Sequence, residues 1–247
     1  MKGNNIYDFQ HYGSSDVEPD RSNMYPPVIE NSDADLHKLC YQGAHELYGE
    51  NLPDIVEERL KMELDAMKEN GYAGLYVIVQ KLVNKSLQAG YPVGARSLVG
   101  SSFVAFTAGI TDINPLSPHY ICPKCHYSDF NSKTVIKHRG GCGYDLPDKN
   151  CPVCGTPLRK EGFDISPEVF MGIDGKKMPF IDLNFSGQVL NVIKPYAEEL
   201  FGEGKCFLSG TPDTTAINLL YGYVQKNSVN DKENTSRSEQ DKHRPFD

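Results

Sequence analysis

Two pairs of cysteines have the types and spacing to close one metal-binding shell. The first pair is Cys122 and Cys125, and the second is Cys151 and Cys154. Each pair brings two sulfurs within reach of one ion in a single tight turn, so the four thiolates predict tetrahedral zinc. The metal would replace a hydrophobic core for the loop of residues 126–150. A complete four-sulfur shell leaves no open position for a substrate, so we interpret the zinc as structural.

Other metal-binding side chains lie close to these pairs and are excluded from the predicted shell. His126 follows the first pair directly, and Cys142 lies between glycines inside the loop, but four sulfurs already complete the coordination. We interpret His119 as a hydrogen-bonded structural histidine. No disulfide framework is evident for the three remaining cysteines, Cys40, Cys142 and Cys206. Reduced thiols of this kind are typical of the cytoplasm.

A glycine- and serine-rich loop and a later strand form a second group of residues whose types and order are typical of a reactive site. Residues 90–102 are the loop, and a helix beginning near Ser101 would turn its free N–H groups toward an anion. Residues 180–185 read FIDLNF, and this alternation predicts a strand with Asp182 and Asn184 on one face. In nucleotidyl transfer a loop holds the triphosphate and carboxylates hold two magnesium ions, and this layout matches.

Helices are expected on both sides of these motifs. Apolar residues at helical spacing predict a helix from an Asp33 N-cap to Gly49, a second from an Asn51 N-cap to residue 70, and a buried helix over residues 72–89. For the first half of residues 72–89, two strands are the alternative interpretation. After the strand, an amphipathic helix is expected from Gly187 to about residue 202, with Pro195 bending it. A short strand at 206–208 and a last helix at 214–224 follow.

Composition narrows the class of protein. The chain has 247 residues, enough for one or two domains, and a formal net charge of −8, so as a whole it does not attract a phosphate backbone. Nucleic-acid binding would need a local basic surface. The candidates are Lys133, Lys137, His138, Arg139, Arg159, Lys160, Lys176 and Lys177. No stretch predicts a membrane helix or a secretory signal, and we expect a cytoplasmic protein without membrane contact.

Several stretches, taken in order, match one known family. They read VGARSLVGSSFVA at 93–105, NPL at 114–116, PHY at 118–120, DLPDKNC at 145–151 and IDLNFSG at 181–187. Together they closely resemble the palm region of PolC-type replicative DNA polymerase III alpha subunits, and the cysteine pairs belong to the same pattern. The resemblance covers roughly residues 25–224.

The resemblance implies a fold class and a domain organisation. The fold is α/β (α+β), a nucleotidyltransferase-like polymerase palm with a mixed sheet and helices, plus a zinc-ribbon insertion. The expected segments are a disordered stretch at 1–32, a helical and phosphate-loop part at 33–117, the ribbon at 118–162, a catalytic-strand part at 163–225 and a disordered tail at 226–247. DNA and deoxynucleotides are the implied partners, with magnesium as the family's catalytic metal.

The resemblance also implies which residues of this chain would act. Phosphate binding is carried over to five positions of the loop, namely Gly94, Arg96, Gly100, Ser101 and Ser102. The family's catalytic strand has two aspartates two positions apart, and this chain has Phe180 in place of the first and Asp182 in place of the second. The family's third metal-binding aspartate would lie beyond residue 247. A single carboxylate makes a poor site for two magnesium ions.

Three interpretations follow. The favoured one is a truncated relative of PolC-type polymerases that is catalytically inactive, a pseudoenzyme. A second keeps nucleotidyl transfer, with Asp164, Glu168 or Asp174 replacing the missing ligand. The third is a zinc-stabilised module that binds DNA or a replisome protein, and the acidic net charge argues against it. Whether the chain acts as an enzyme stays open at this level.

Overall fold

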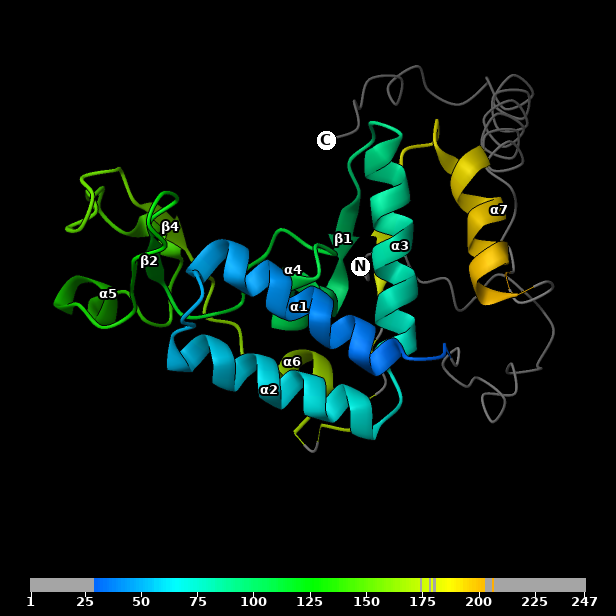
Figure 1. The fold of residues 1–247 in the computed structure, drawn as a ribbon, viewed down its shortest axis with the longest axis horizontal. Coiled ribbons are helices and arrows are strands. Elements are labelled where there is room, and N and C mark those ends of the chain that lie inside the picture. The colour runs from blue at the N-terminus through cyan, green and yellow to red at the C-terminus, as the bar shows by residue number, and fades with distance from the viewer. Residues whose placement is uncertain (1–28, 174, 178, 180, 203–205, 207–247) are drawn as a thin grey trace, which may run out of the picture. The chain divides into compact units, whose positions relative to one another are not determined.

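The computed structural model describes residues 29–173, 175–177, 179, 181–202 and 206. The chain divides into two units, residues 1–201 and residues 202–247, and nearly all described residues belong to the first. Within the first unit, helices accompany two small antiparallel sheets, which confirms the α/β class (Figure 1). Phe180, most of the predicted strand at 206–208, the helix at 214–224 and nearly all of both predicted disordered ends lie outside the described residues.

The regular elements are as follows. The helices are α1 (Ser32–Tyr48), α2 (Asp54–Glu69), α3 (Ala73–Gln88), α4 (Phe103–Thr107), α5 (Lys133–Lys137), α6 (Glu168–Met171) and α7 (Leu190–Phe201), with 3-10 turns η3 (Ser97–Ser101) and η4 (Gly143–Asp145). The strands are β1 (Gly94–Arg96), β2 (His119–Ile121), β3 (Ser128–Asp129), β4 (Arg159–Glu161) and β5 (Asp182–Asn184). No helix in the described ranges is long and apolar enough to cross a lipid bilayer.

The first four helices build the main core. α1 packs against α2, α3 and α4, and their apolar faces bury Leu36, Leu60 and Phe103 almost completely. α1 and α4 come unusually close at Gly43, where an added Cβ would lie 2.1 Å from the carbonyl oxygen of Thr107. This face of α1 therefore requires glycine, because the end of α4 packs directly against it.

Two predicted helix starts were wrong, although the helices themselves are confirmed. α1 begins at Ser32, and Asp33 lies in its first turn, where a carboxylate interacts favourably with the helix dipole without capping it. α2 begins after Pro53 and not after Asn51, because proline has no N–H to donate and its φ of −61° suits the residue before a helix. The predicted end of α1 at Gly49 is confirmed, with φ at 84°.

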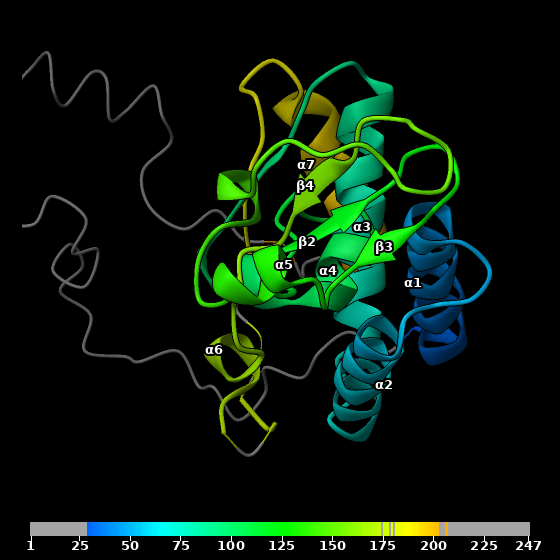
Figure 2. The ribbon, with the colours of Figure 1, turned by 90° about the vertical axis from the view of Figure 1, so that its left-hand side faces the viewer.

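The two sheets serve different parts of the chain. β1 pairs with β5, and these strands join the loop after α3 to the segment before α7. β3, β2 and β4 form the second sheet, in that order, within the cysteine-bearing segment of residues 118–162, which we call the ribbon (Figure 2). α7 contains Pro195, as predicted, and packs against α3 through Ile78, Leu82 and Ile193.

Candidate metal centre and phosphate loop

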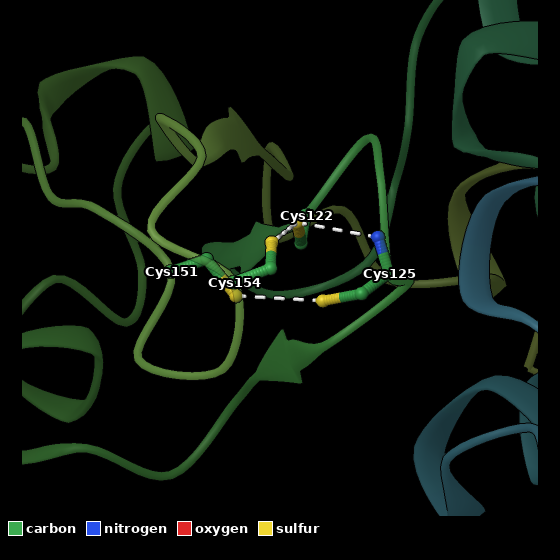
Figure 3. A group of neighbouring side chains, drawn as sticks. All are labelled: Cys122, Cys125, Cys151 and Cys154. Carbon is green, nitrogen blue, oxygen red and sulfur yellow. Dashed lines mark hydrogen bonds between the residues drawn. The ribbon is translucent and has the colours of Figure 1, made fainter.

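The four predicted cysteine ligands converge in the structure. Their sulfur atoms all lie within 4.8 Å of one another, and Figure 3 shows the side chains meeting from two loops. The Sγ atoms of Cys122 and Cys154 are 3.4 Å apart, and those of Cys125 and Cys151 are 3.5 Å apart. A tetrahedral ion with bonds of about 2.3 Å to sulfur has edges of about 3.8 Å. The donor set therefore fits a thiolate-bound metal ion.

The two cysteine pairs lie in separate backbone turns of the same kind. The N–H of Cys122 donates to the carbonyl of Tyr127, and the N–H of Cys151 donates to the carbonyl of Thr156. In both turns the residue after the second cysteine has a positive φ, 59° for His126 and 75° for Gly155. This left-handed residue turns the chain back, so that both sulfurs of a pair point to the same side. The turns differ because glycine adopts this conformation freely and histidine does not.

At one of the four cysteines, hydrogen bonding favours ionised sulfur. Hydrogen bonds with the side chain and the backbone of Thr156 lower the pKa of the Cys154 thiol to about 6. The thiolate is the form that binds a metal ion, so this cysteine is prepared as a ligand near neutral pH. Cys142 and His126, both excluded at the sequence level, are not members of the four-sulfur cluster.

A chain of hydrogen bonds attaches the ribbon to α1. The amide of Asn114 donates to the hydroxyl of Tyr48, which is 2.9 Å from Nε2 of His119. Nδ1 of His119 lies 2.7 Å from the carbonyl oxygen of Ser117, so Nδ1 carries the proton and Nε2 accepts. Burial lowers the pKa of His119 to about 4 and keeps the ring neutral. The structural role predicted for this histidine is confirmed.

The pairing of β1 with β5 brings the two predicted halves of the second site together. Their register sets Gly94 opposite Asn184 and Arg96 opposite Asp182. Asp182 and Asn184 are both exposed while Leu183 is partly buried, so the predicted shared face of the strand is confirmed. The glycine-rich loop thus begins next to the one family-matched carboxylate, although nearly ninety residues separate them in the sequence.

The N-terminus of α4 already has an anionic partner, and this partner is Glu63. The N–H groups of Phe103 and Val104 each donate to its carboxylate at 3.0 Å, and the hydroxyl of Ser102 donates at 2.9 Å. The same hydroxyl caps α4 by accepting from the N–H of Ala105 at 3.1 Å. The sequence predicted N–H groups free to face an external anion, and in the structure the side chain of Glu63, 0% exposed, satisfies them.

Arg59 completes this buried arrangement from one turn earlier on α2. Its Nε is 2.5 Å from Glu63, and its other end donates to the carbonyls of Ser101 at 2.8 Å and Ile165 at 3.2 Å. Arg59 and Glu63 therefore attach the end of the loop to α2. Sequence reasoning missed both residues. A usable indication was available, since Glu63 falls at helical spacing on the same face as Leu60 and Met67.

The predicted phosphate-binding residues lie in different environments. Ser101 is 3% exposed and donates to the carbonyl of Leu98, whereas Gly94 is exposed. Gly100 lies against Ile113. Phosphate binding at Gly94, Arg96, Gly100, Ser101 and Ser102 stays a prediction. Among described residues, the four cysteines are the one cluster of three or more metal-binding groups, so Asp164 and Glu168 do not join Asp182 in one. Asp174, the third replacement considered, lies outside the described residues.

Comparisons with known proteins agree with this arrangement. The model of the bacterial DNA polymerase III alpha NTPase domain matches residues 34–227, which is most of the chain. The chain belongs to this family. It is 54% identical over 211 residues to a PolC-type DNA polymerase III of Caldanaerobacter subterraneus subsp. tengcongensis, 49% identical over 210 residues to one of Thermotoga maritima, and 47% identical over 210 residues to one of Bacillus subtilis.

These matches cover 85% of the chain but only 14–15% of each relative. The predicted resemblance to PolC-type DNA polymerase III is thereby confirmed, and the family membership spans both the cysteine cluster and the β1–β5 pair. The chain corresponds to a small part of each relative. The polymerase activity for which those relatives are named belongs to much longer proteins.

Proposed function

We propose that this chain forms the phosphate-loop and metal-strand portion of a PolC-type polymerase palm. The observation that carries the proposal is the antiparallel pairing of β1 with β5, which sets Arg96 of the loop opposite Asp182. Within this portion the loop would bind the triphosphate of a deoxynucleotide, and Asp182 would bind one magnesium ion. DNA and deoxynucleotides are the proposed partners, and a replisome protein is a further candidate.

We also propose that the four cysteines hold a structural zinc ion. Cys122, Cys125, Cys151 and Cys154 supply four sulfurs, the set that tetrahedral zinc prefers. A bound ion would cross-link the two turns of the ribbon and would take no part in catalysis, because four protein ligands leave no open position. Reduced thiols fit a cytoplasmic protein, and the cytoplasm stays the proposed location.

The chain by itself is proposed to be catalytically inactive. In the sequence, Phe180 stands two positions before Asp182, where the family pattern has its first aspartate. A phenyl ring cannot bind a cation through oxygen, and magnesium requires near-octahedral oxygen coordination. One carboxylate therefore lacks the second ligand needed to hold two ions on the reacting phosphates.

Nucleotide binding and incorporation test this proposal separately. The purified chain should bind a fluorescent deoxynucleoside triphosphate in the presence of magnesium and should add no nucleotide to a primed template. Arg96→Gln should weaken triphosphate binding at least several-fold, and Lys81→Gln, an exposed lysine of α3 outside the loop, should leave it unchanged. Measurable incorporation would contradict inactivity, and equal binding by Arg96→Gln and Lys81→Gln would contradict the role of the loop.

A further inference from the structure

The ribbon has a charge opposite to that of the rest of the chain. Residues 118–162 contain seven Lys and Arg against four Asp and Glu, a net +3, although the whole chain is at −8. The remaining residues carry 18 positive against 29 negative side chains, a net −11. A surface that attracts anions is therefore to be sought on the ribbon and not on the helical part of the protein.

Three ribbon cations are already paired within the fold. Lys149 is 3.0 Å from Asp129, Arg159 is 2.5 Å from Glu161, and Lys160 is 2.8 Å from Asp148. These contacts use three of the ribbon's four carboxylates. The fourth, Asp145, is exposed in η4 and makes no ion pair with a described residue. The paired cations add little to the attraction of an external anion.

Three other cations gather on and just after α5, and we call Lys133, Lys137 and Arg139 the α5 cations. All three are exposed and make no ion pair within the described part of the chain. Lys133 and Lys137 are four residues apart on one helix, so they lie on the same face with about 5–6 Å between their Cβ atoms. Figure 2 places α5 beside β2 of the ribbon sheet.

The fold holds this segment at both ends. Before α5, the carboxylate of Asp129 accepts from the N–H groups of Asn131 at 3.2 Å and Ser132 at 2.8 Å. Ser132 then caps α5. After α5, the N–H of Gly140 donates to the carboxylate of Asp164. The α5 cations are therefore presented on a positioned element, which lowers the ordering cost of binding an extended anion.

We propose that the α5 cations form a binding surface for the phosphate backbone of duplex DNA. Phosphates follow one another at about 3.4 Å of helix axis along each strand, so Lys133 and Lys137, one helical turn apart, and Arg139 just after them can contact several phosphates. Lysine and arginine side chains here would contact phosphates without reading bases, and binding would be independent of sequence. This surface lies on the ribbon and does not depend on nucleotide binding at the loop.

Salt-dependent binding of the zinc-loaded chain to a labelled duplex of mixed sequence tests the proposal. Removing three phosphate contacts should lower the slope of log affinity against log salt by about 2.7, roughly 0.9 for each contact. The test variant is Lys133→Gln with Lys137→Gln and Arg139→Gln. The matched control is Lys61→Gln with Lys68→Gln and Lys81→Gln, which removes the same charge from exposed positions on α2 and α3.

The expected result is that the α5 variant loses affinity and slope while the control variant keeps both. At three contacts the original chain should lose roughly 40-fold in affinity between 50 and 200 mM salt. Single Gln substitutions at the α5 positions should each remove about a third of the slope difference. No binding by the original chain at 50 mM salt, or equal losses in the two triple variants, would overturn the proposal. Polymerisation and triphosphate binding are not read out, so failure here would bear on DNA as a partner of the ribbon and would leave the roles proposed for the loop and for Asp182 untouched.

Discussion

The ribbon and the helical part of this protein are held together by different forces. The helical part buries long aliphatic and aromatic faces from α1, α2, α3 and α4 in one continuous core. The ribbon core contains Tyr120, Cys122, Val135, Leu146, Cys151 and Leu158, so two of its few buried residues are proposed metal ligands. Apolar burial supports the first region, whereas the proposed zinc site would support the second.

The two regions nevertheless share a seam of apolar and polar contacts, and Ile121 and Phe130 of the ribbon are buried in the core of the helical part. His119 links the first ribbon strand to Tyr48 of α1, and Nδ1 of His126 lies 3.2 Å from the carbonyl oxygen of Leu47. The ring of His119 also stacks on Phe130 with 4.1 Å between ring centres. Perturbations can therefore separate three contributions, namely the metal, the helical core and the seam.

Removing one cysteine ligand should have the largest effect. Cys151→Ser should abolish stoichiometric zinc binding and unfold the ribbon, because zinc contributes on the order of 10 kcal/mol to domains of this kind. The helices α1, α2 and α3 should persist. Zinc content and far-ultraviolet circular dichroism measure the two effects. Cys142→Ser is the control, since this ribbon cysteine lies outside the four-sulfur cluster. Zinc retained by Cys151→Ser would contradict the proposal that the ribbon depends on a zinc ion held by this cysteine.

Removing the buried carboxylate of Glu63 from the helical part should have the second-largest effect. Glu63→Gln places an amide against backbone N–H groups and removes the partner of Arg59, so we expect a loss of about 3–5 kcal/mol in unfolding free energy. Glu58→Gln, exposed on the same helix, should change stability by less than about 0.5 kcal/mol. Urea unfolding followed through the helical signal measures both. Equal values for the two variants would remove the importance assigned to Glu63.

Acidification should weaken the seam through His119. Its folded pKa of about 4 lies below the unfolded value of about 6.5, so the unfolded chain takes up the proton first and stability falls as pH drops below 6.5. Between pH 7.5 and 5.5 this group should account for a loss of about 1 kcal/mol. His119→Phe should lack that part of the pH dependence, and His37→Gln, exposed on α1, should keep it. Identical pH profiles for all three proteins would argue against this role.

The smallest effect should distinguish the two cysteine turns. Gly155 has φ at 75° and an added Cβ there meets nothing within 4 Å, so Gly155→Ala should cost only the backbone strain, about 1 kcal/mol. In the other turn, His126→Gly relieves similar strain but loses the contact with Leu47. Competition with a chelator should show roughly 5-fold weaker metal binding for Gly155→Ala. A larger effect from His126→Gly would show that the seam outweighs the strain.

Much of the local structure could be predicted from the residues alone. Helical spacing of apolar side chains predicted α1, α2, α3 and α7, because this spacing repeats over a few consecutive turns of the chain. The starts of α1 and α2 could not be predicted. Asn31 and Pro53 precede these helices without a capping side chain, so the ends depend on the backbone path between packed elements.

The candidate site was likewise predictable from the sequence in part and not in full. Cysteine spacing identified all four members of the four-sulfur cluster, since each pair lies within one turn. The phosphate loop and Asp182 were identified by family resemblance, but their pairing through β1 and β5 is a contact between distant segments. Nothing in the loop itself indicated that a glutamate from α2 would bond the first N–H groups of α4.

The sequence by itself determined the four cysteines that cluster, the main helices and the alternating strand that exposes Asp182. Each of these depends on spacing over a few residues, where backbone geometry leaves little choice. Only the tertiary structure decided that Glu63 and Arg59 would hold the phosphate loop, and that β5 would lie against β1. Those contacts join segments forty to ninety residues apart, and which distant groups meet is set by how the helices pack around their core.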